Sequence, residues 1–175
     1  MIGKGKSISH GVAALEYDLA KEINGQAVAT EIARHELYGC TGAEMVQEMK
    51  PYHIDFPNVK NNCLRFEVSP SIEESATFTD ADWAELGNDF MQRMGLANHQ
   101  YIIIRHSGTE SKKEQAHLHI LANRVSLSGE LYRDNWIGKK ATEAANAIAK
   151  ERNFVQSQDI GKVNKAEIKE AMDGV

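Results

Sequence analysis

The stretch that most constrains the fold is residues 100–125, QYIIIRHSGTESKKEQAHLHILANRV. Apolar and polar side chains alternate in its first and last thirds, which predicts two strands joined by a polar loop. If these strands pair as an antiparallel hairpin, His106 lies opposite His117, and His119 shares the face of His117. Three imidazoles would then meet at one end of a sheet.

These three histidines are candidate metal ligands. Imidazole is the commonest metal ligand in proteins, and a His-x-His pair on a strand places two rings on one side. Three protein ligands with open positions are typical of a catalytic site, and by ligand chemistry alone they suit Zn²⁺, Mn²⁺ or Ni²⁺. The alternative is that they are ordinary core or surface histidines, and the pattern by itself leaves both interpretations open.

The composition indicates one globular domain over residues 1–175. A hydrophobic content of 42% with 26% charged residues is ordinary for such a domain. No apolar run approaches the ~20 residues of a membrane span, and the N-terminus has no secretory signal, so we expect no membrane partner. Cys40 and Cys63 lack metal-type spacing, and we interpret them as reduced thiols of a cytoplasmic protein.

The net charge of −5 argues against indiscriminate nucleic-acid binding, but the charge is uneven. Residues 66–92 contain seven acids and no lysine or arginine, and an acidic loop is expected at 70–77. Basic residues gather instead in the predicted hairpin and at the N-terminus, which gives one face a positive potential if they lie together. A solvated surface with scattered cations is equally compatible. The basic residues concerned are Lys4, Lys6, Arg105, Lys112, Lys113 and Arg124.

The rest of the chain predicts an α+β domain with a mainly antiparallel sheet of about five strands backed by helices. Residues 1–9 resemble a phosphate loop only superficially, because no strand or first glycine precedes them. The other elements follow from periodicity and from capping boxes at Thr41/Glu44 and Thr79/Asp82. Helices are expected at 10–22, 41–49, 79–94, 139–151 and 164–172, and strands at 27–37, 61–69, 101–106, 117–125 and 130–133. The apolar stripe of the first helix is expected to consist of Val12, Leu15, Leu19 and Ile23.

Two runs carry a family resemblance: FTDADWAELGNDFMQRMGLANHQYIIIRH and HLHILANRV. They resemble the relaxase/mobilization nucleases of the MobA/MobL type, which nick plasmid or transposon DNA and belong to the HUH endonucleases. The specific motif consists of an upstream histidine, an acidic loop, a His-hydrophobic-His run and then Asn-Arg-Val. Here the histidines are His106, His117 and His119, followed by Asn123 and Arg124. The resemblance covers most of the chain and implies an HUH relaxase fold.

The resemblance implies transesterification at one DNA phosphodiester of an origin of transfer during conjugative mobilization. Tyr17, in the first helix, matches the nucleophilic tyrosine, which would form a 5′-phosphotyrosine and release a 3′-hydroxyl. Read without the resemblance, Tyr17 is an amphipathic packing residue. The family also implies Mg²⁺ or Mn²⁺ on the three histidines. The run ending at Ser71 corresponds to a strand whose Ser/Thr-containing end, here Ser69, approaches DNA.

The chain departs from the family where an aspartate usually follows the upstream histidine in a His-x-Asp pattern. Gly108 occupies that position. A carboxylate that orients a metal-bound imidazole is the physical role to be filled. Glu110 or Glu114 in the loop is therefore predicted to substitute as a catalytic residue, and the sequence does not choose between them.

Alternatives come from other classes. A rolling-circle replication initiator would place its tyrosine after His-x-His, but Tyr132 lacks the lysine of a Tyr-x-x-Lys pattern. A non-catalytic metal- or DNA-binding module is the second alternative. A cupin-like enzyme would need a glutamate close behind His-x-His, and Glu130 is too distant. By resemblance, the partners are single-stranded origin DNA, accessory relaxosome proteins and a coupling protein, and the chain is a nuclease domain, in some relatives the N-terminal part of a longer protein.

Overall fold

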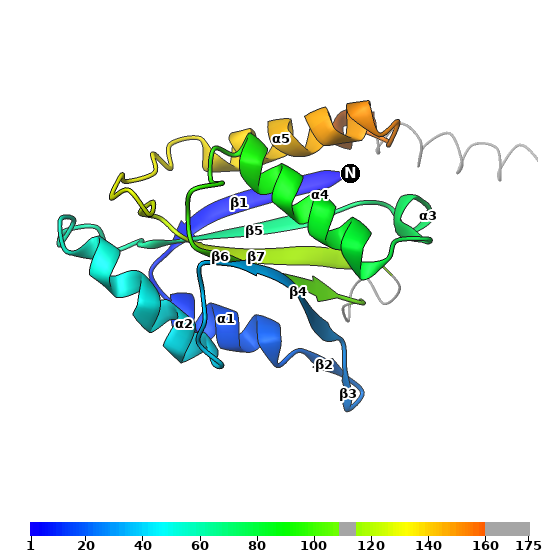
Figure 1. Ribbon diagram of the computed structural model, residues 1–175. Coiled ribbons are helices and arrows are strands. Elements are labelled where there is room, and N and C mark those ends of the chain that lie inside the picture. The colour runs from blue at the N-terminus through cyan, green and yellow to red at the C-terminus, as the bar shows by residue number, and fades with distance from the viewer. Residues whose placement is uncertain (109–114, 160–175) are drawn as a thin grey trace, which may run out of the picture.

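A computed structural model of the protein describes residues 1–108 and 115–159, and the helix expected at 164–172 lies outside them. A five-stranded sheet with the order β1-β5-β7-β6-β4 forms the centre (Figure 1). All neighbouring strands in it run antiparallel. The predicted α+β class with a mainly antiparallel sheet is confirmed. The strands are β1 (Ile2–Ile8), β4 (Ala29–His35), β5 (Cys63–Ser69), β6 (Tyr101–His106) and β7 (His117–Asn123).

Helices cover the sheet on both faces (Figure 1). One face packs against α4 and α5, and its core includes Phe66, Phe90 and Ile120. The other face packs against α1 and α2, around a smaller core that includes Leu15 and Ile102. The helices are α1 (Gly11–Leu19), α2 (Gly42–Met49), η1 (Lys50–His53), α3 (Ile72–Ser75), α4 (Asp80–Arg93) and α5 (Ile137–Glu151). In the described residues, no helix is long and apolar enough to cross a membrane.

The register of the β6–β7 hairpin is as predicted. His106 lies opposite His117, and Ile104 lies opposite His119. The predicted starts of α2 and α4 are also confirmed, because capping boxes at Thr41 and Thr79 supply acceptors for otherwise unpaired backbone N–H groups. These features depend on residues close in sequence, which explains why the sequence was sufficient.

Strand β1 is an element that the sequence did not predict. Its alternate residues Gly3 and Gly5 face α5, and a Cβ atom at Gly3 would lie 2.4 Å from the backbone oxygen of Ala141. Because glycine has poor strand propensity, the local sequence conceals this strand. Pairing with β5 and the close approach of α5 stabilise it.

Two smaller predictions need correction. The strand expected at 130–133 is wrong, since only a single bridge joins Val125 to Leu131. The acidic segment expected as a loop after β5 contains α3, which opens with a capping box between Ser71 and Glu74. The turn at Asn24-Gly25 is a hairpin turn with positive φ at both residues, between β2 (Glu22–Ile23) and β3 (Gln26–Ala27).

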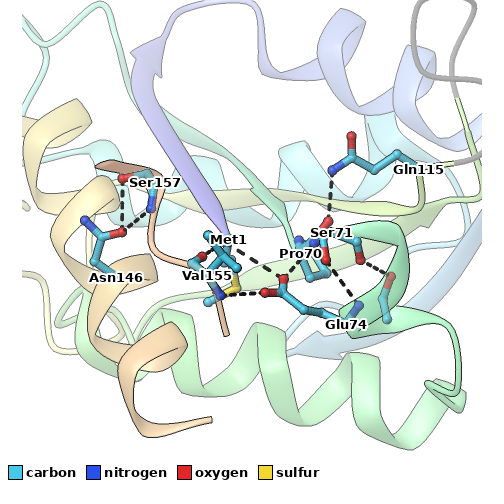
Figure 2. A network of polar contacts seen from close by, with 9 residues as sticks. Met1, Pro70, Ser71, Glu74, Gln115, Asn146, Val155 and Ser157 are labelled. Atoms are coloured by element: carbon cyan, nitrogen blue, oxygen red, sulfur yellow. Dashed lines mark hydrogen bonds and ion pairs between the residues drawn. The ribbon is translucent and has the colours of Figure 1, made fainter. Parts of the chain in front are cut away.

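The segment after α5 returns to the beginning of β1 and to α3 (Figure 2). The Met1 amino group donates to the carbonyl of Val155, and the Val155 N–H donates to Glu74 Oε1 over 2.6 Å. Glu74 also closes the α3 capping box through the N–H of Ser71. The Glu74 carboxylate, which is partly buried and also lies 4.0 Å from the Met1 amino group, thus joins three segments that are far apart in sequence.

Candidate metal centre and its surroundings

His106, His117 and His119 converge at one end of the β6–β7 hairpin. A candidate ligand nitrogen from each ring lies within 4.8 Å of the other two. The Nε2 atoms of His117 and His119 are 3.1 Å apart, and the ring centroids of His106 and His119 are 4.4 Å apart. His106 and His117 are buried, while the His119 side chain retains 12% exposure. The structure therefore brings together all three predicted metal ligands.

Hydrogen bonds fix two of the rings. His106 Nε2 lies 2.7 Å from the backbone oxygen of Asp18, and His117 Nδ1 lies 3.0 Å from that of Gln115. Because carbonyl oxygens only accept, both ring nitrogens carry the proton. Nδ1 of His106 and Nε2 of His117 therefore remain as lone-pair donors, which is the arrangement that metal-bound imidazoles show.

Burial favours the uncharged form of His106 and His119. It lowers the pKa of His106, although the nearby Asp18 opposes the shift. It lowers the pKa of His119 to about 2, with further lowering by the neighbouring imidazoles and by Arg65 and Lys21. A neutral imidazole is the form that binds a metal ion.

The distances suit a divalent ion. Metal–nitrogen bonds of ~2.0–2.1 Å place adjacent ligand nitrogens ~3–3.5 Å apart, close to the separation between His117 and His119. The three histidines can thus hold a divalent metal.

Asp18 is a residue of the site that the sequence interpretation missed. It is buried, and its Oδ1 lies 4.0 Å from His119 Nδ1. Arg65 from β5 binds both of its oxygens, with Nη2–Oδ1 at 2.5 Å and Nε–Oδ2 at 3.1 Å. Arg65 Nη2 is itself 3.5 Å from His119 Nδ1. The ion pair between Asp18 and Arg65 therefore lies next to His119, on the side of its Nδ1 atom.

A signal for Asp18 existed in the sequence. The buried residues of α1 are Gly11, Ala14, Leu15 and Asp18, which recur at helical spacing. The predicted apolar stripe began instead at Val12, which is 40% exposed. An acid on the inward stripe of a helix needs a buried partner, and that requirement marks Asp18 as a candidate site residue.

Tyr17 lies on the exposed side of α1, next to Asp18. Its side chain is 58% exposed, and its hydroxyl accepts a hydrogen bond of 2.7 Å from Lys21 Nζ. The charge of Lys21 also lowers the pKa of both His106 and His119. Tyr17 is thus exposed and in contact with Lys21, and it precedes Asp18, whose backbone oxygen accepts a hydrogen bond from His106.

Two predicted DNA-binding lysines border the site. Lys4 and Lys6 from β1 line a cleft of about 220 Å³ that reaches Arg65 and His119. Lys4 is 3.5 Å from Glu67, and both lysine side chains are exposed. This part of the sheet face forms a positively charged approach to the histidines.

The other predicted residues lie elsewhere. Arg105 projects on the opposite sheet side, bound to Asp80 and Thr30. Asn123 is buried and bonded to Met49, His53 and Gln100, while Arg124 uses Nε, Nη1 and Nη2 to bind Tyr132, Asn61 and Asp134. Ser69 is buried at the end of β5, and its hydroxyl makes no hydrogen bond within the described residues. Glu110, Lys112, Lys113 and Glu114 lie outside the described residues.

Comparison with known proteins agrees with this geometry. The family described as "Relaxase: MobA/VirD2-like, nuclease domain" matches residues 17–154, from Tyr17 through all three histidines. No curated protein matches the chain. The matched region covers well over half of the sequence and contains the whole histidine cluster.

Proposed function

The chain belongs to the MobA/VirD2-like relaxase nuclease family, and from this premise we propose that it nicks one DNA strand at an origin of transfer by tyrosine transesterification. Family membership supports a relaxase-type, DNA-nicking function in general. The observation that carries the finer proposal is the convergence of three imidazoles beside the helix that bears Tyr17.

The three histidines hold a divalent ion in this proposal, with Mg²⁺ or Mn²⁺ favoured by the family and Zn²⁺ or Ni²⁺ allowed by the ligands. When bound, such an ion supplies positive charge to a nonbridging phosphate oxygen and offsets the negative charge that develops there. His106 and His117 keep their orientation through the carbonyls of Asp18 and Gln115.

Tyr17 supplies the nucleophile. Its phenolic oxygen bonds to phosphorus, the bond from phosphorus to the 3′-oxygen breaks, and that oxygen takes a proton and leaves as a 3′-hydroxyl. Lys21 already donates to the phenolic oxygen, and such a charge-assisted hydrogen bond stabilises negative charge on it. The reverse reaction reseals the strand without ATP, because the phosphotyrosine conserves the phosphodiester energy.

Asp18 takes the role that the missing aspartate at Gly108 leaves open. Its Oδ1 lies 4.0 Å from His119 Nδ1, the ring nitrogen at which an acceptor orients a metal-bound imidazole, and Arg65 Nη2 lies 3.5 Å from the same nitrogen. Arg65 holds that carboxylate in place with two hydrogen bonds. Asp18 is thus the positioning carboxylate in this proposal, and Glu110 and Glu114 are not required for that task.

The DNA strand is proposed to approach through the cleft lined by Lys4 and Lys6. Arg105 and Arg124 are left out of the DNA-contacting set, because their guanidinium groups already bind protein partners. Asn123 is left out for the same reason. Accessory relaxosome proteins and a coupling protein complete the proposed mobilization machinery.

A covalent-adduct assay tests this function. The protein is incubated with Mn²⁺ and a single-stranded library of random sequence labelled at the 3′ end. Because the proposed adduct forms on the 5′-phosphate of the downstream fragment, the 3′ label should stay with the protein in denaturing gels, whereas a 5′ label should not. The variant Tyr17→Phe should abolish the adduct, and Tyr38→Phe, at a tyrosine that is 77% exposed, is the matched control.

Further variants distinguish the alternatives. An adduct that persists in Tyr17→Phe and disappears in Tyr132→Phe would indicate the motif order of a replication initiator and refute the proposal. Binding of Mn²⁺ without any adduct would indicate a non-catalytic module. His119→Ala should abolish metal-dependent nicking, and an unchanged rate in that variant would exclude the histidines from the reaction.

A further inference from the structure

Trp136 is unfavourable for the stability of the fold in two ways, through its exposed side chain and through its backbone conformation. Its side chain is 76% exposed. Its backbone adopts a left-handed conformation with φ 61° and ψ 23° at the N-cap of α5, where no side-chain cap hydrogen bond forms. A bulky residue in this region is strained, and an exposed indole gains little from burial. Trp136 therefore has a strained backbone and little stabilising packing within the protein. Contact of its side chain with a ligand would explain why a tryptophan occupies this position.

The surroundings of Trp136 are basic. Arg133 and Lys139 are exposed and flank it in sequence, and Lys140 lies with its ammonium 5.3 Å from the ring centre of Tyr132. Two acids lie in this region: Asp134 is bound to Arg124 over 2.8 Å, and Glu143 is 3.8 Å from Lys139. The acids of residues 66–92 lie instead mostly on α3 and α4. Cations interleaved with aromatic rings are typical of surfaces that bind single-stranded nucleic acid.

A hydrogen bond joins the loop that contains Trp136 to strand β1, which carries Lys4 and Lys6. Ser7 donates a hydrogen bond of 2.6 Å to Asp134, two residues before Trp136. Ser7 directly follows Lys6, which lines the cleft that leads to His119. Strand β1 is the edge of the sheet, so no further strand separates Trp136 from this approach. Lys6 and Ser7 point to opposite faces of β1, so a DNA strand that leaves the cleft of the histidine cluster reaches Trp136 by crossing this edge strand.

We propose that Trp136 stacks on a base of the single DNA strand that passes over the edge strand β1 to the histidine cluster. This inference rests on the proposed function, and it names a binding contact outside the reacting centre. Stacking on an indole tolerates every base, so Trp136 contributes affinity and position rather than recognition of the nick sequence.

Tryptophan fluorescence reports on this contact directly. The chain has two tryptophans, and the other, Trp83, is buried at 2% exposure. Titration with oligo(dT) should quench the solvent-exposed component of the emission, because a base stacked on the indole quenches it. In Trp136→Phe this quenching should vanish. Binding without any quenching in the unmodified protein would overturn the proposal.

A second variant separates ligand binding from folding. Trp136→Asn suits the left-handed backbone and can cap the helix, so its melting temperature should be unchanged or higher. Its Kd for oligo(dT), measured by anisotropy, should rise about 5- to 150-fold, the range for one lost base stack, while Trp136→Phe should retain most affinity. The matched control Tyr38→Asn removes an equally exposed ring among Glu36, Glu44 and Glu48, and should leave Kd unchanged.

The outcomes distinguish this inference from the nicking proposal. Quenching and weakened binding in the absence of any covalent adduct would support the stacking contact and refute the nicking activity. An adduct that forms normally, with Kd unchanged in Trp136→Asn, would refute the stacking contact alone.

Discussion

Removal of the Asp18 carboxylate should both destabilise the fold and weaken metal binding. In Asp18→Ala, Arg65 loses the acceptor of its hydrogen bonds at 2.5 and 3.1 Å. Its guanidinium, on a side chain with 23% exposure, is then left beside His119 with no carboxylate. Breaking a fully buried ion pair costs about 3–5 kcal/mol, and because water still reaches Arg65 we expect about 2–3 kcal/mol here.

The assay is thermal unfolding followed by circular dichroism in metal-free buffer. At roughly 2–4 °C per kcal/mol for a domain of this size, the melting temperature should fall by about 5–10 °C. The double variant Asp18→Ala/Arg65→Met should recover part of the loss, because it leaves no uncompensated charge. Asp55→Ala, at an exposed acid, is the matched control and should change stability by less than about 0.5 kcal/mol.

Metal affinity gives the second readout. The acceptor nearest His119 Nδ1 is lost, and loss of such a partner typically weakens metal binding about 10- to 100-fold. Titration with Mn²⁺ in competition with a chromogenic chelator measures this, with the double variant as a folded comparison. A stability within about 0.5 kcal/mol of the unmodified protein, together with unchanged Mn²⁺ affinity, would refute the role assigned to the carboxylate.

Three further predictions concern stability and reactivity. Gly3→Val should destabilise the protein by at least about 1–3 kcal/mol in thermal melts, because the new Cβ atom would lie only 2.4 Å from the backbone oxygen of Ala141 in α5. An unchanged melting temperature would show that β1 does not pack closely against α5. Burial raises the pKa of the Cys63 thiol to about 11, so Ellman's reagent should titrate only the exposed Cys40 until denaturant is added. In metal-free protein, the free energy of unfolding should fall as the pH drops below about 6.5. Burial lowers the pKa of His106 and His119 in the folded protein, so in this pH range only the unfolded chain takes up their protons. A free energy of unfolding that stays constant from pH 7.5 to 5 would contradict this.

The sequence by itself determined the features that depend on neighbouring residues. Alternation over residues 100–125 gave the hairpin, its register and the meeting of the three histidines. The capping boxes at Thr41 and Thr79 marked the starts of two helices. These predictions succeeded because strand period and helix capping are set within a few residues along the chain.

The tertiary structure alone decided the features that join distant segments. It formed β1 from a glycine-rich run, brought Asp18 and Arg65 together across 47 positions of sequence, and occupied Arg124 with partners of its own. Charged side chains on a sequence look equally available for DNA, but burial and ion pairing select which of them remain free. Those long-range energies are absent from local sequence patterns. The meeting of the three histidines could therefore be predicted, whereas the inward stripe of α1 marked Asp18 as buried without identifying Arg65 as its partner.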